Sequence, residues 1–402
     1  MDKIAEYKKV ILLVLLVGLL LSFSCKNSGV MKKVHHYPEP IEQAPEISVL
    51  VKSRQSSVTI RVEGDFYILP LYGSDVIRSE RLLRKGVIQP DGKNLKLNSL
   101  KISCSGIRIV GKEQTRIYLS GDRYPGELVV LNRSGKHLDV INRVDLETYL
   151  CGVLKCEVNP SWPASSLKAQ AVASRTYALF QMKERADREY HLSSTTLSQV
   201  YKGSKMPSLK VSRAVRATRG IIIVYDWHIV EARFCSSCGG TTANNDNVFY
   251  EPFTPVLSGR KCPFCGGSPD INWSVTLGKA DIANALRQHA RRKIDRIRRI
   301  EPHRYGVGKR IAKIKIVHSR GSEIMKGNDF RLAIIKGIGV RKLKSLKCTI
   351  SNQENTVTFS GSGWGHGVGM CQFGAKGMAE RGYDFLSILK YYYRGCDFLK
   401  IY

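Results

Sequence analysis

The sequence has few acidic residues for its length. Its 402 residues include 34 Asp and Glu against 64 Lys and Arg, a formal net charge of +30. Such a charge favours a polyanionic partner, either nucleic acid or an anionic cell envelope. Hydrophobic residues make up 43% and glycine contributes 35 residues, as in ordinary globular proteins, so the composition does not indicate a disordered chain.

The chain also lacks an uninterrupted apolar run of the about 20 residues that span a membrane comfortably. Residues 10–23 (VILLVLLVGLLLSF) follow Lys8-Lys9 and have the length of a signal-peptide core. The following Ser-Cys resembles a lipoprotein processing site, where Cys25 would be lipidated; a short uncleaved anchor is the alternative. We therefore expect residues 1–25 to direct export to the periplasm or another extracytoplasmic space. This expectation argues against nucleic acid as the partner and favours membrane attachment.

The rest of the chain divides by the period of its apolar residues. Residues 26–46 are polar with three prolines and indicate a linker. Residues 47–143 contain short runs with β-branched alternation, broken by Gly, Asp and Ser, which predict a β-rich scaffold. Helical and strand patterns mix over 144–402. The sequence thus predicts one α+β domain over 47–402 with a β-rich N-terminal part.

A helix is predicted from Val144, where the apolar period changes. Its apolar face is formed by Leu146, Tyr149, Leu150, Val153 and Leu154. Asp145 is the expected N-cap, and prolines after Glu157 end the helix before a second one starts at Ser165 or Ser166. Later elements are predicted as two strands turning at Asp226-Trp227, a loop over 235–270, a helix becoming densely basic over 281–300, strands near 312–318 and 346–360, and a closing glycine-rich loop with a helix.

Glu157 is the sharpest candidate for chemistry. It lies where the first helix meets the turn CEVNPSWP, so the negative end of the helix dipole disfavours its ionised form. Apolar neighbours such as Trp162 raise its pKa further, as a general acid acting on a glycosidic oxygen requires. On spacing alone, an ordinary surface glutamate at a helix end is the stronger interpretation.

The segment GSGWGHGVGMCQFG supplies a second candidate. Five glycines between Gly361 and Gly369 are interleaved with Trp364 and His366. Glycines permit close backbone approach to a ligand, an indole stacks on sugar faces, and His366 and Gln372 can hydrogen-bond a substrate. The alternative is a tight structural turn.

Together these segments resemble the SpoIID/LytB family of bacterial wall proteins. The resemblance covers about residues 45–402 and keeps the order of the motifs. The motifs are YPGELVVLNRSGKHLDVINRVDLETYL (124–150), VDLETYLCGVLKCEVNPSWPASSLKAQAVASRTYAL (144–179), SQVYKG (198–203), AVRATRGIIIVY (214–225), CSSCGGTTANNDNVF (235–249) and GWGHGVGMCQFGAKGMAERG (363–382).

The resemblance implies a peptidoglycan lytic transglycosylase in the sporulation branch, and an enhancer of a wall amidase in the other. Glu157 would be catalytic, cutting between N-acetylmuramic acid and N-acetylglucosamine, in strands stripped of stem peptides. The family's other motif positions would contact the glycan: Lys168, Gln170, Arg175, Tyr177, Gln199, Tyr201, Trp364, His366 and Gln372. For Arg175, a buried structural arginine paired to a carboxylate is an equally strong interpretation. Catalysis would require no cofactor.

Some family members bind zinc just before the Gln-x-Tyr motif. Here His191 is present, but Thr195, Thr196 and Ser198 occupy that segment, so we do not expect this zinc site. Two C-x-x-C pairs, each followed by Gly-Gly, instead predict a structural zinc on Cys235, Cys238, Cys262 and Cys265. Disulfides or a redox motif are the alternatives. Cys371, where the family has serine, is interpreted as a tolerated substitution.

The basic run from Arg287 to Arg304 is interpreted as a solvated cationic helix face, or alternatively as an attachment to an anionic membrane or wall polymer. Three functions remain open on the sequence. The leading one is the transglycosylase. The others are a non-catalytic enhancer that binds an amidase or glycan, and a zinc-braced extracytoplasmic binding protein.

Overall fold

The computed structural model describes residues 41–195, 199–203 and 208–402. The signal segment, Cys25 and most of the linker therefore lie outside the described residues, as do Thr196 and Ser198. Helix accounts for 26% and strand for 38% of the chain, with strands concentrated at the N-terminal side, which confirms the α+β prediction. No helix among the described residues is long and apolar enough to cross a membrane.

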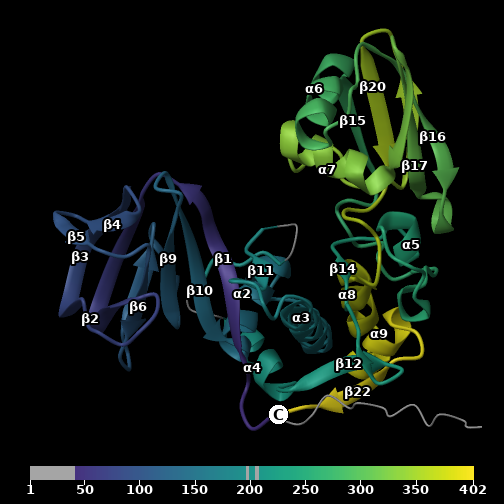
Figure 1. Cartoon of the computed structure of the whole chain (residues 1–402). Helices are drawn as coiled ribbons and strands as arrows, with labels where there is room; N and C mark the ends of the chain where they lie inside the picture. Colours follow the sequence, from purple (N-terminus) through teal and green to yellow (C-terminus); the bar gives the residue numbers. More distant parts are fainter. Residues whose placement is uncertain (1–40, 196–198, 204–207) are drawn as a thin grey trace, which may run out of the picture. The chain divides into compact units, whose positions relative to one another are not determined.

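The β-rich part forms one sheet that, within the described residues, has eleven strands (Figure 1). The main order is β11-β1-β10-β9-β6-β2-β3-β4-β5; β7 pairs with β2 and β8. The strands are β1 (Glu46–Gln55), β2 (Val58–Pro70), β3 (Arg78–Asp91), β4 (Asn94–Leu97), β5 (Leu100–Ile102), β6 (Gly106–Gly111), β7 (Arg116–Leu119), β8 (Asp122–Tyr124), β9 (Glu127–Arg133), β10 (His137–Asp145) and β11 (Leu192–Ser193). Alternate β-branched residues, such as Ile47 and Val49 of β1, are buried.

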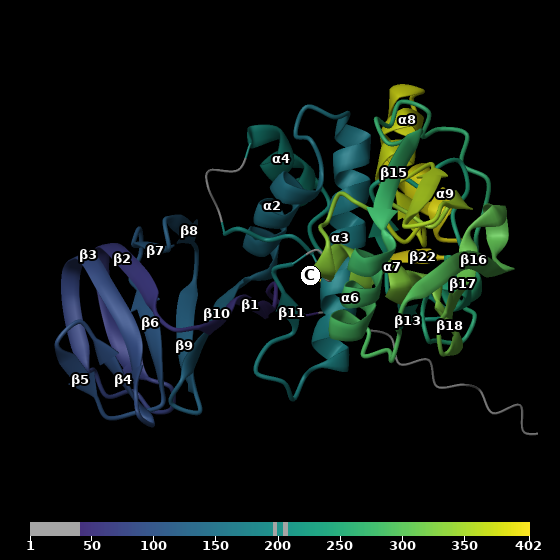
Figure 2. The same cartoon turned by 90° about the horizontal axis from the view of Figure 1, so that it is seen from above.

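Three helices come after β10, with β11 between the last two: α2 (Leu146–Glu157), α3 (Ala164–Glu184) and α4 (Leu209–Ala217). The predicted cap of α2 is confirmed, because Asp145 accepts a hydrogen bond from the Thr148 N–H at 2.9 Å. Alanines at 169, 171 and 173 are fully buried in α3 and let neighbouring elements approach closely. Both views show α3 between α2 and α4 on one side and α8 and α9 on the other (Figures 1 and 2).

The segments after α4 form three short strand pairs and the helices α5, α8 and α9. The predicted strand pair is confirmed as β12 and β13, whose turn residues Asp226 and Trp227 have φ values of 48° and 63°. β22 pairs antiparallel with β12, and β14 pairs parallel with β21. The bounds are β12 (Ile221–Tyr225), β13 (His228–Ile229), β14 (Phe234–Cys235), α5 (Asn245–Val248), η1 (Pro255–Leu257), β21 (Met370–Cys371), α8 (Gln372–Glu380), α9 (Phe385–Tyr392) and β22 (Asp397–Lys400).

Between η1 and β21 the chain builds a unit with its own core, which the sequence patterns did not separate from the rest of residues 144–402. Its two sheets are ordered β15-β20-β19 and β16-β17-β18. Buried residues of both sheets and both helices, including Leu286, Ile314, Phe330 and Phe359, form one cluster. The bounds are β15 (Trp273–Gly278), α6 (Lys279–His289), β16 (Ile297–Tyr305), η2 (Val307–Lys309), β17 (Ile311–His318), β18 (Gly321–Lys326), α7 (Gly327–Gly337), β19 (Cys348–Asn352) and β20 (Thr356–Gly361).

The prediction that the basic run 287–304 forms a helix face is wrong. Helix α6 ends at His289, and the run continues through a connection into strand β16. Ile297 and Ile300 are both buried, a spacing of three that suggests a helix. In the structure this spacing comes from a register shift between Ile297 and Arg299 in the β16–β17 pair, which places two arginines between the buried isoleucines.

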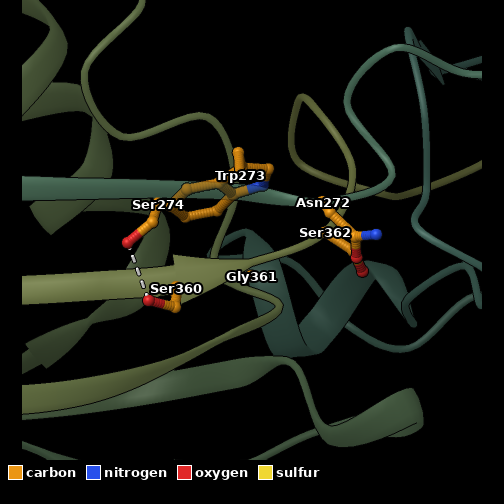
Figure 3. Close-up of a pocket in the computed structure, with 6 residues that line it drawn as sticks. All are labelled: Asn272, Trp273, Ser274, Ser360, Gly361 and Ser362. Carbon is orange, nitrogen blue, oxygen red and sulfur yellow. Dashed lines mark hydrogen bonds between the residues drawn. The ribbon is translucent and has the colours of Figure 1, made fainter.

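An open, uncharged cavity of about 600 Å³ lies at one end of the β15–β20 strand pair, where β15 begins and β20 ends (Figure 3). Ser274 and Ser360 face each other across the two strands, with their hydroxyl oxygens 2.8 Å apart. Trp273 borders the cavity and donates its indole N–H to the Gly363 carbonyl at 3.0 Å. This bond connects the strand pair to the start of the glycine-rich loop.

Candidate functional site

Glu157 is the last residue of α2, and its carboxyl group is held from two directions. The backbone N–H of Val200 donates to its Oε1 at 2.8 Å, and Gln372 also hydrogen-bonds the carboxyl group. Burial raises the pKa of Glu157 above the usual 4.5, and these two hydrogen bonds oppose the shift. The carboxyl is thus partly buried and predisposed to hold a proton.

A glycine inside α2 allows the Val200 segment to approach. A Cβ atom on Gly152 would lie 2.6 Å from the Tyr201 ring and 2.7 Å from the Gly203 carbonyl oxygen. Glycine costs a helix about 1 kcal/mol relative to alanine, so its presence here needs a packing reason. The reason is that residues 200–203 must lie directly on α2 to bring the Val200 N–H to Glu157.

A buried chain of polar side chains continues from Gln372. Its Nε2 donates to Gln170 Oε1 at 3.4 Å, and Gln170 Nε2 donates to Ser174 Oγ at 3.0 Å. From the other side, Gln199 Nε2 donates to the Ser174 carbonyl and its Oε1 accepts from the Tyr149 hydroxyl. The structure therefore brings Glu157, Gln170, Gln199 and Gln372 together, and packing and hydrogen bonds fix their orientations.

Arg175 belongs to a separate buried network, which favours the structural interpretation. Its guanidinium is fully buried and binds Glu147 through two hydrogen bonds of 2.6 and 2.8 Å. It also donates to the carbonyls of Ile221 and Val215, while the Tyr402 hydroxyl donates to Glu147. Each of its three nitrogens donates to a protein acceptor, and these bonds tie α2, α3, α4 and β12 together, as a structural role for Arg175 predicts.

Tyr201 is likewise part of the scaffold. Its side chain is 1% exposed, its ring lies 4.8 Å from that of Tyr149, and its hydroxyl donates to Asn142 at 2.8 Å. Lys168 and Tyr177 are partly buried on α3. The Lys168 ammonium lies 5.9 Å from the centre of the Phe385 ring, and burial raises the pKa of Tyr177 to about 12. None of these contacts reaches Glu157.

The glycine-rich loop packs against its own chain, as expected for a tight structural turn. Gly363 and Gly367 have φ values of 81° and 84°. A Cβ on Gly363 would lie 2.6 Å from the Ser237 carbonyl oxygen, and one on Gly367 would lie 2.6 Å from the Arg310 guanidinium. These glycines therefore allow close contact with protein, and they are needed without invoking a ligand.

The two ring residues of this loop contact the 233–249 region. The Trp364 backbone exchanges hydrogen bonds with Ser237, and its partly buried ring faces the Lys344 ammonium at 5.5 Å. His366 accepts from the Val368 N–H through Nδ1 and hydrogen-bonds the backbone of Phe234. Burial, with nearby arginines, lowers its pKa to about 3, so the ring is neutral and is held by backbone groups.

The cysteine cluster differs from the prediction by one residue. Four buried cysteines, Cys238, Cys262, Cys265 and Cys371, bring their sulfur atoms within 4.8 Å of one another. Cys235 is not a member: it lies against Gly365, and burial raises the pKa of its thiol to about 12. The interpretation of Cys371 as a neutral substitution is wrong, because the parallel pairing of β14 with β21 brings position 371 beside the first C-x-x-C segment.

The chemistry of this cluster suits a thiolate-bound metal ion. Cys238 and Cys265 have sulfur atoms 3.8 Å apart, close to the roughly 3.8 Å edge of a tetrahedron with 2.3 Å metal–sulfur bonds and far from the about 2.05 Å of a disulfide. Backbone N–H groups of Cys238, Gly240 and Gly374 donate to cluster sulfurs. A hydrogen bond from Cys238 lowers the pKa of Cys265, which favours the thiolate. The four cysteines could therefore hold a metal ion.

His191 is held by the backbone of a neighbouring strand. The His191 ring accepts a hydrogen bond from the Ser48 N–H at 3.1 Å, and burial lowers its pKa. His191 thereby joins the segment before β11 to β1.

Sequence patterns missed several residues of the two buried networks around Glu157 and Arg175. Glu147, the partner of Arg175, looked like an ordinary acidic residue of a helix first turn. Val200 acts through its backbone N–H and Gly152 through the absence of a side chain, and neither property appears as a motif. Ser174 lies at an unspecified position between the motif residues Gln170 and Arg175, so the motif does not single it out.

Comparisons with known proteins agree with these motifs. The model of the SpoIID family, described as "Stage II sporulation protein", matches residues 134–225, and a domain of unknown function (DUF8618) matches residues 268–369. An uncharacterized protein of Brachyspira hyodysenteriae (strain ATCC 49526 / WA1) is 32% identical over 359 residues, which cover 87% of this chain and 92% of that protein.

Two relatives come from Bacillus subtilis (strain 168). The amidase enhancer is 28% identical over 75% of this chain and 49% of its own length. Stage II sporulation protein D is 29% identical over 63% of this chain and 74% of its own length. The second family match coincides with the unit that has its own core, between η1 and β21. On these matches, the chain belongs to the SpoIID family.

Proposed function

We propose that this protein is a peptidoglycan lytic transglycosylase that cuts glycan strands between N-acetylmuramic acid and N-acetylglucosamine. The observation that carries the proposal is the environment of Glu157, a partly buried carboxyl group with a raised pKa and fixed orientation. Membership of the SpoIID family, with a relative named for sporulation and another for amidase enhancement, supports a role at the cell wall.

One carboxyl group suffices for this reaction. Protonated Glu157 gives its proton to the oxygen that leaves C1 of N-acetylmuramic acid, and the C1–O bond breaks to an oxocarbenium-like centre. The 6-hydroxyl of the same sugar attacks C1, and the Glu157 carboxylate takes the hydroxyl proton. The product has a 1,6-anhydro end, and Glu157 returns to its protonated state without activating an external water.

The surrounding residues prepare Glu157 for both steps. Burial favours the neutral acid before bond cleavage, while the Val200 N–H and Gln372 stabilise the carboxylate formed when the proton leaves. Gln170 in turn holds Gln372. We therefore propose Gln372 as a positioning residue.

The test is to incubate purified wild-type protein with sacculi, both intact and stripped of stem peptides by an amidase. Mass spectrometry should detect anhydro-muramoyl ends with wild-type protein and none with Glu157→Gln. Glu157→Gln keeps the size of the side chain and both hydrogen-bond partners, so circular dichroism should match wild type. If wild type releases no anhydro product from either substrate, the proposal fails.

We also propose that the cysteine cluster binds zinc in a structural role. Four cysteines leave no open coordination position for substrate or water. Zinc would supply the cross-link between the 262–265 knuckle, Cys238 and the N-terminus of α8, where Cys371 is the cap and Gln372 the first residue. Metal analysis of anaerobically purified protein should give about one zinc per chain.

The amidase-enhancer relative favours a second candidate function. In that case the protein would bind a wall amidase or its glycan without cutting strands. Adding the protein to an amidase assay separates the two: the enhancer function predicts that Glu157→Gln stimulates the amidase as strongly as wild type does.

Either function needs contact with the wall, so we propose that the chain is exported and held at the membrane through its N-terminal segment. Radiolabelled palmitate should be incorporated into wild type and lost in Cys25→Ala if that cysteine carries lipid.

A further inference from the structure

About half of the chain's net charge of +30 lies in residues 273–361, the unit with its own core. The sheet β16-β17-β18 of this unit buries Ile300, Ile314 and Ile316 in that core and turns its other face outward. Residues directly opposite each other on neighbouring strands share a face. The strand register therefore tells which side chains stand together on the outward face.

Three cations form one row across this outward face. Arg304 pairs with Lys313, and Lys313 pairs with Lys326. Neighbouring strands lie about 4.8 Å apart, so the three side chains start close together. Like charges directly opposite each other destabilise a sheet. Solubility needs surface charge but does not need it in one cross-strand row, so the row indicates an anionic partner.

The next row adds two more cations and an apolar side chain. Glu301 pairs with Lys315, and Lys315 pairs with Ile324. The Glu301 carboxylate lies 3.0 Å from the Arg299 guanidinium and 3.6 Å from the Lys315 ammonium. The cations of the face, which outnumber this carboxylate, are Arg299, Arg304, Lys313, Lys315 and Lys326. Two further carboxylates, of Asp246 and Asp329, act on Lys326 at one end of the row.

Exposed apolar and aromatic side chains accompany the cations. At one end of the first row Tyr305 follows Arg304 and is 55% exposed. At the other end the Tyr250 ring is 73% exposed and lies 4.6 Å from the Lys326 ammonium. Ile324, in the second row, is 44% exposed. A soluble phosphate polymer does not require these groups, whereas tyrosine rings and apolar side chains beside cations are typical of a surface in contact with lipid headgroups.

We propose that the outward face of the β16-β17-β18 sheet binds the surface of an anionic phospholipid bilayer. The cations bind lipid phosphates, and Ile324, Tyr250 and Tyr305 enter the headgroup layer. This inference goes beyond the proposed function, because none of these residues belongs to the Glu157 site. It gives the exported chain a second contact with the membrane, besides its proposed N-terminal attachment, and this contact weakens as the salt concentration rises.

The test uses residues 26–402, because the apolar segment before Cys25 would insert into any bilayer. The core clusters of the described residues lie between Ile47 and Ile401, so this chain keeps them. The probes are vesicles of phosphatidylcholine alone and vesicles that also contain phosphatidylglycerol, and co-sedimentation measures binding. Wild type should bind the anionic vesicles at least about tenfold more tightly than the neutral ones.

The first variant, R304Q/K313Q, removes the two exposed cations of the first row. It leaves Lys326, whose ammonium also donates to the carbonyls of Asp246 and Phe249. R304Q/K313Q should bind anionic vesicles about ten- to thirtyfold more weakly than wild type, with binding to neutral vesicles unchanged.

The matched control is R84Q/K85Q, which removes one arginine and one lysine, both exposed, from strand β3 of the β-rich part. It should bind anionic vesicles like wild type. If the control loses as much affinity as R304Q/K313Q, or if wild type binds neutral and anionic vesicles equally, the proposal is overturned.

A second variant separates a bilayer from a soluble polyanion. Ile324→Thr keeps a β-branched side chain but has less apolar surface, so it should bind anionic vesicles about threefold more weakly. Inorganic polyphosphate offers phosphate charge without an apolar phase, and Ile324→Thr should bind it like wild type. If Ile324→Thr binds anionic vesicles as tightly as wild type does, the face serves a soluble polyanion and the membrane proposal is wrong.

A measurement on wild type alone covers a variant that fails to fold. Raising the sodium chloride concentration should release wild type from anionic vesicles; binding that stays the same from low to high salt refutes the proposal. Because the vesicles contain no glycan, absence of anhydro product in the transglycosylase assay would leave these results unaffected.

Discussion

Replacing Arg175 by methionine separates a structural arginine from a substrate-binding one. In the native protein the fully buried guanidinium pairs with Glu147 and two backbone carbonyls. Methionine fills much of the same volume but leaves the Glu147 carboxylate in a buried position with the Tyr402 hydroxyl as its remaining donor among these contacts. Breaking a buried pair by removing one partner costs about 3–5 kcal/mol.

This loss should lower the midpoint of thermal unfolding of the 402-residue chain by about 4–6 °C, measured by circular dichroism. The double variant Arg175→Met with Glu147→Leu removes the stranded charge and should recover most of the loss, because an apolar pair of similar volume often replaces a buried ion pair at little cost. Arg175→Lys should fall between wild type and Arg175→Met, since lysine keeps the charge but cannot form two parallel hydrogen bonds to a carboxylate.

Glycan binding, measured at a temperature well below the unfolding midpoint, completes the test. A structural arginine predicts that folded Arg175→Met retains glycan binding in proportion to its folded fraction. An unchanged unfolding midpoint together with loss of glycan binding would refute the structural role and assign Arg175 to the substrate.

Three further predictions concern the surroundings of Glu157. Gln372→Leu removes a hydrogen bond that lowers the pKa of Glu157, so this pKa should rise. The alkaline limb of the kcat–pH profile, where the acid loses its proton, should then move to higher pH. A shift of this limb to lower pH would contradict the assignment. Cys371→Ser should lower the metal content below one per chain in metal analysis while Cys235→Ser retains it, and the reverse result would restore the original ligand set. Gly152→Ala should destabilise the fold by about 1–3 kcal/mol in urea unfolding, because its Cβ would overlap Tyr201; a gain of about 1 kcal/mol, as helix propensity alone would give, would contradict the packing argument.

The first helix could be predicted from the sequence because its determinants are local. Asp145 caps it, its apolar residues repeat with the helical period, and Glu157 ends it beside a proline-rich turn. The same local logic failed for the basic run before Tyr305. There two exposed arginines at a strand irregularity reproduce a helical spacing, and only the pairing with β17 reveals the strand.

The sequence could predict that a cluster of cysteines forms, but it could not predict which cysteines belong to the cluster. C-x-x-C spacing is a local signal for metal ligands, whereas the fourth cysteine of the cluster comes from a segment more than 100 residues away. The choice between Cys235 and Cys371 depends on the β14–β21 pairing and on Gly365 covering Cys235, and both are properties of the folded chain. For the same reason, the motif that contains Arg175 could not show whether this residue faces substrate or Glu147.

The cluster and the carboxyl group are connected through a short stretch of chain. Cys371 is both a cluster member and the N-cap of α8, its sulfur accepting the Gly374 N–H, and the next residue is Gln372. The second hydrogen bond to Glu157, from the Val200 N–H, depends on Gly152 and is independent of the cysteine cluster. Loss of the proposed metal should therefore act on Glu157 through Gln372 alone, weakening the stabilisation of the carboxylate while the Val200 hydrogen bond remains. The metal would then support catalysis by positioning a neutral amide, without contacting the glycan.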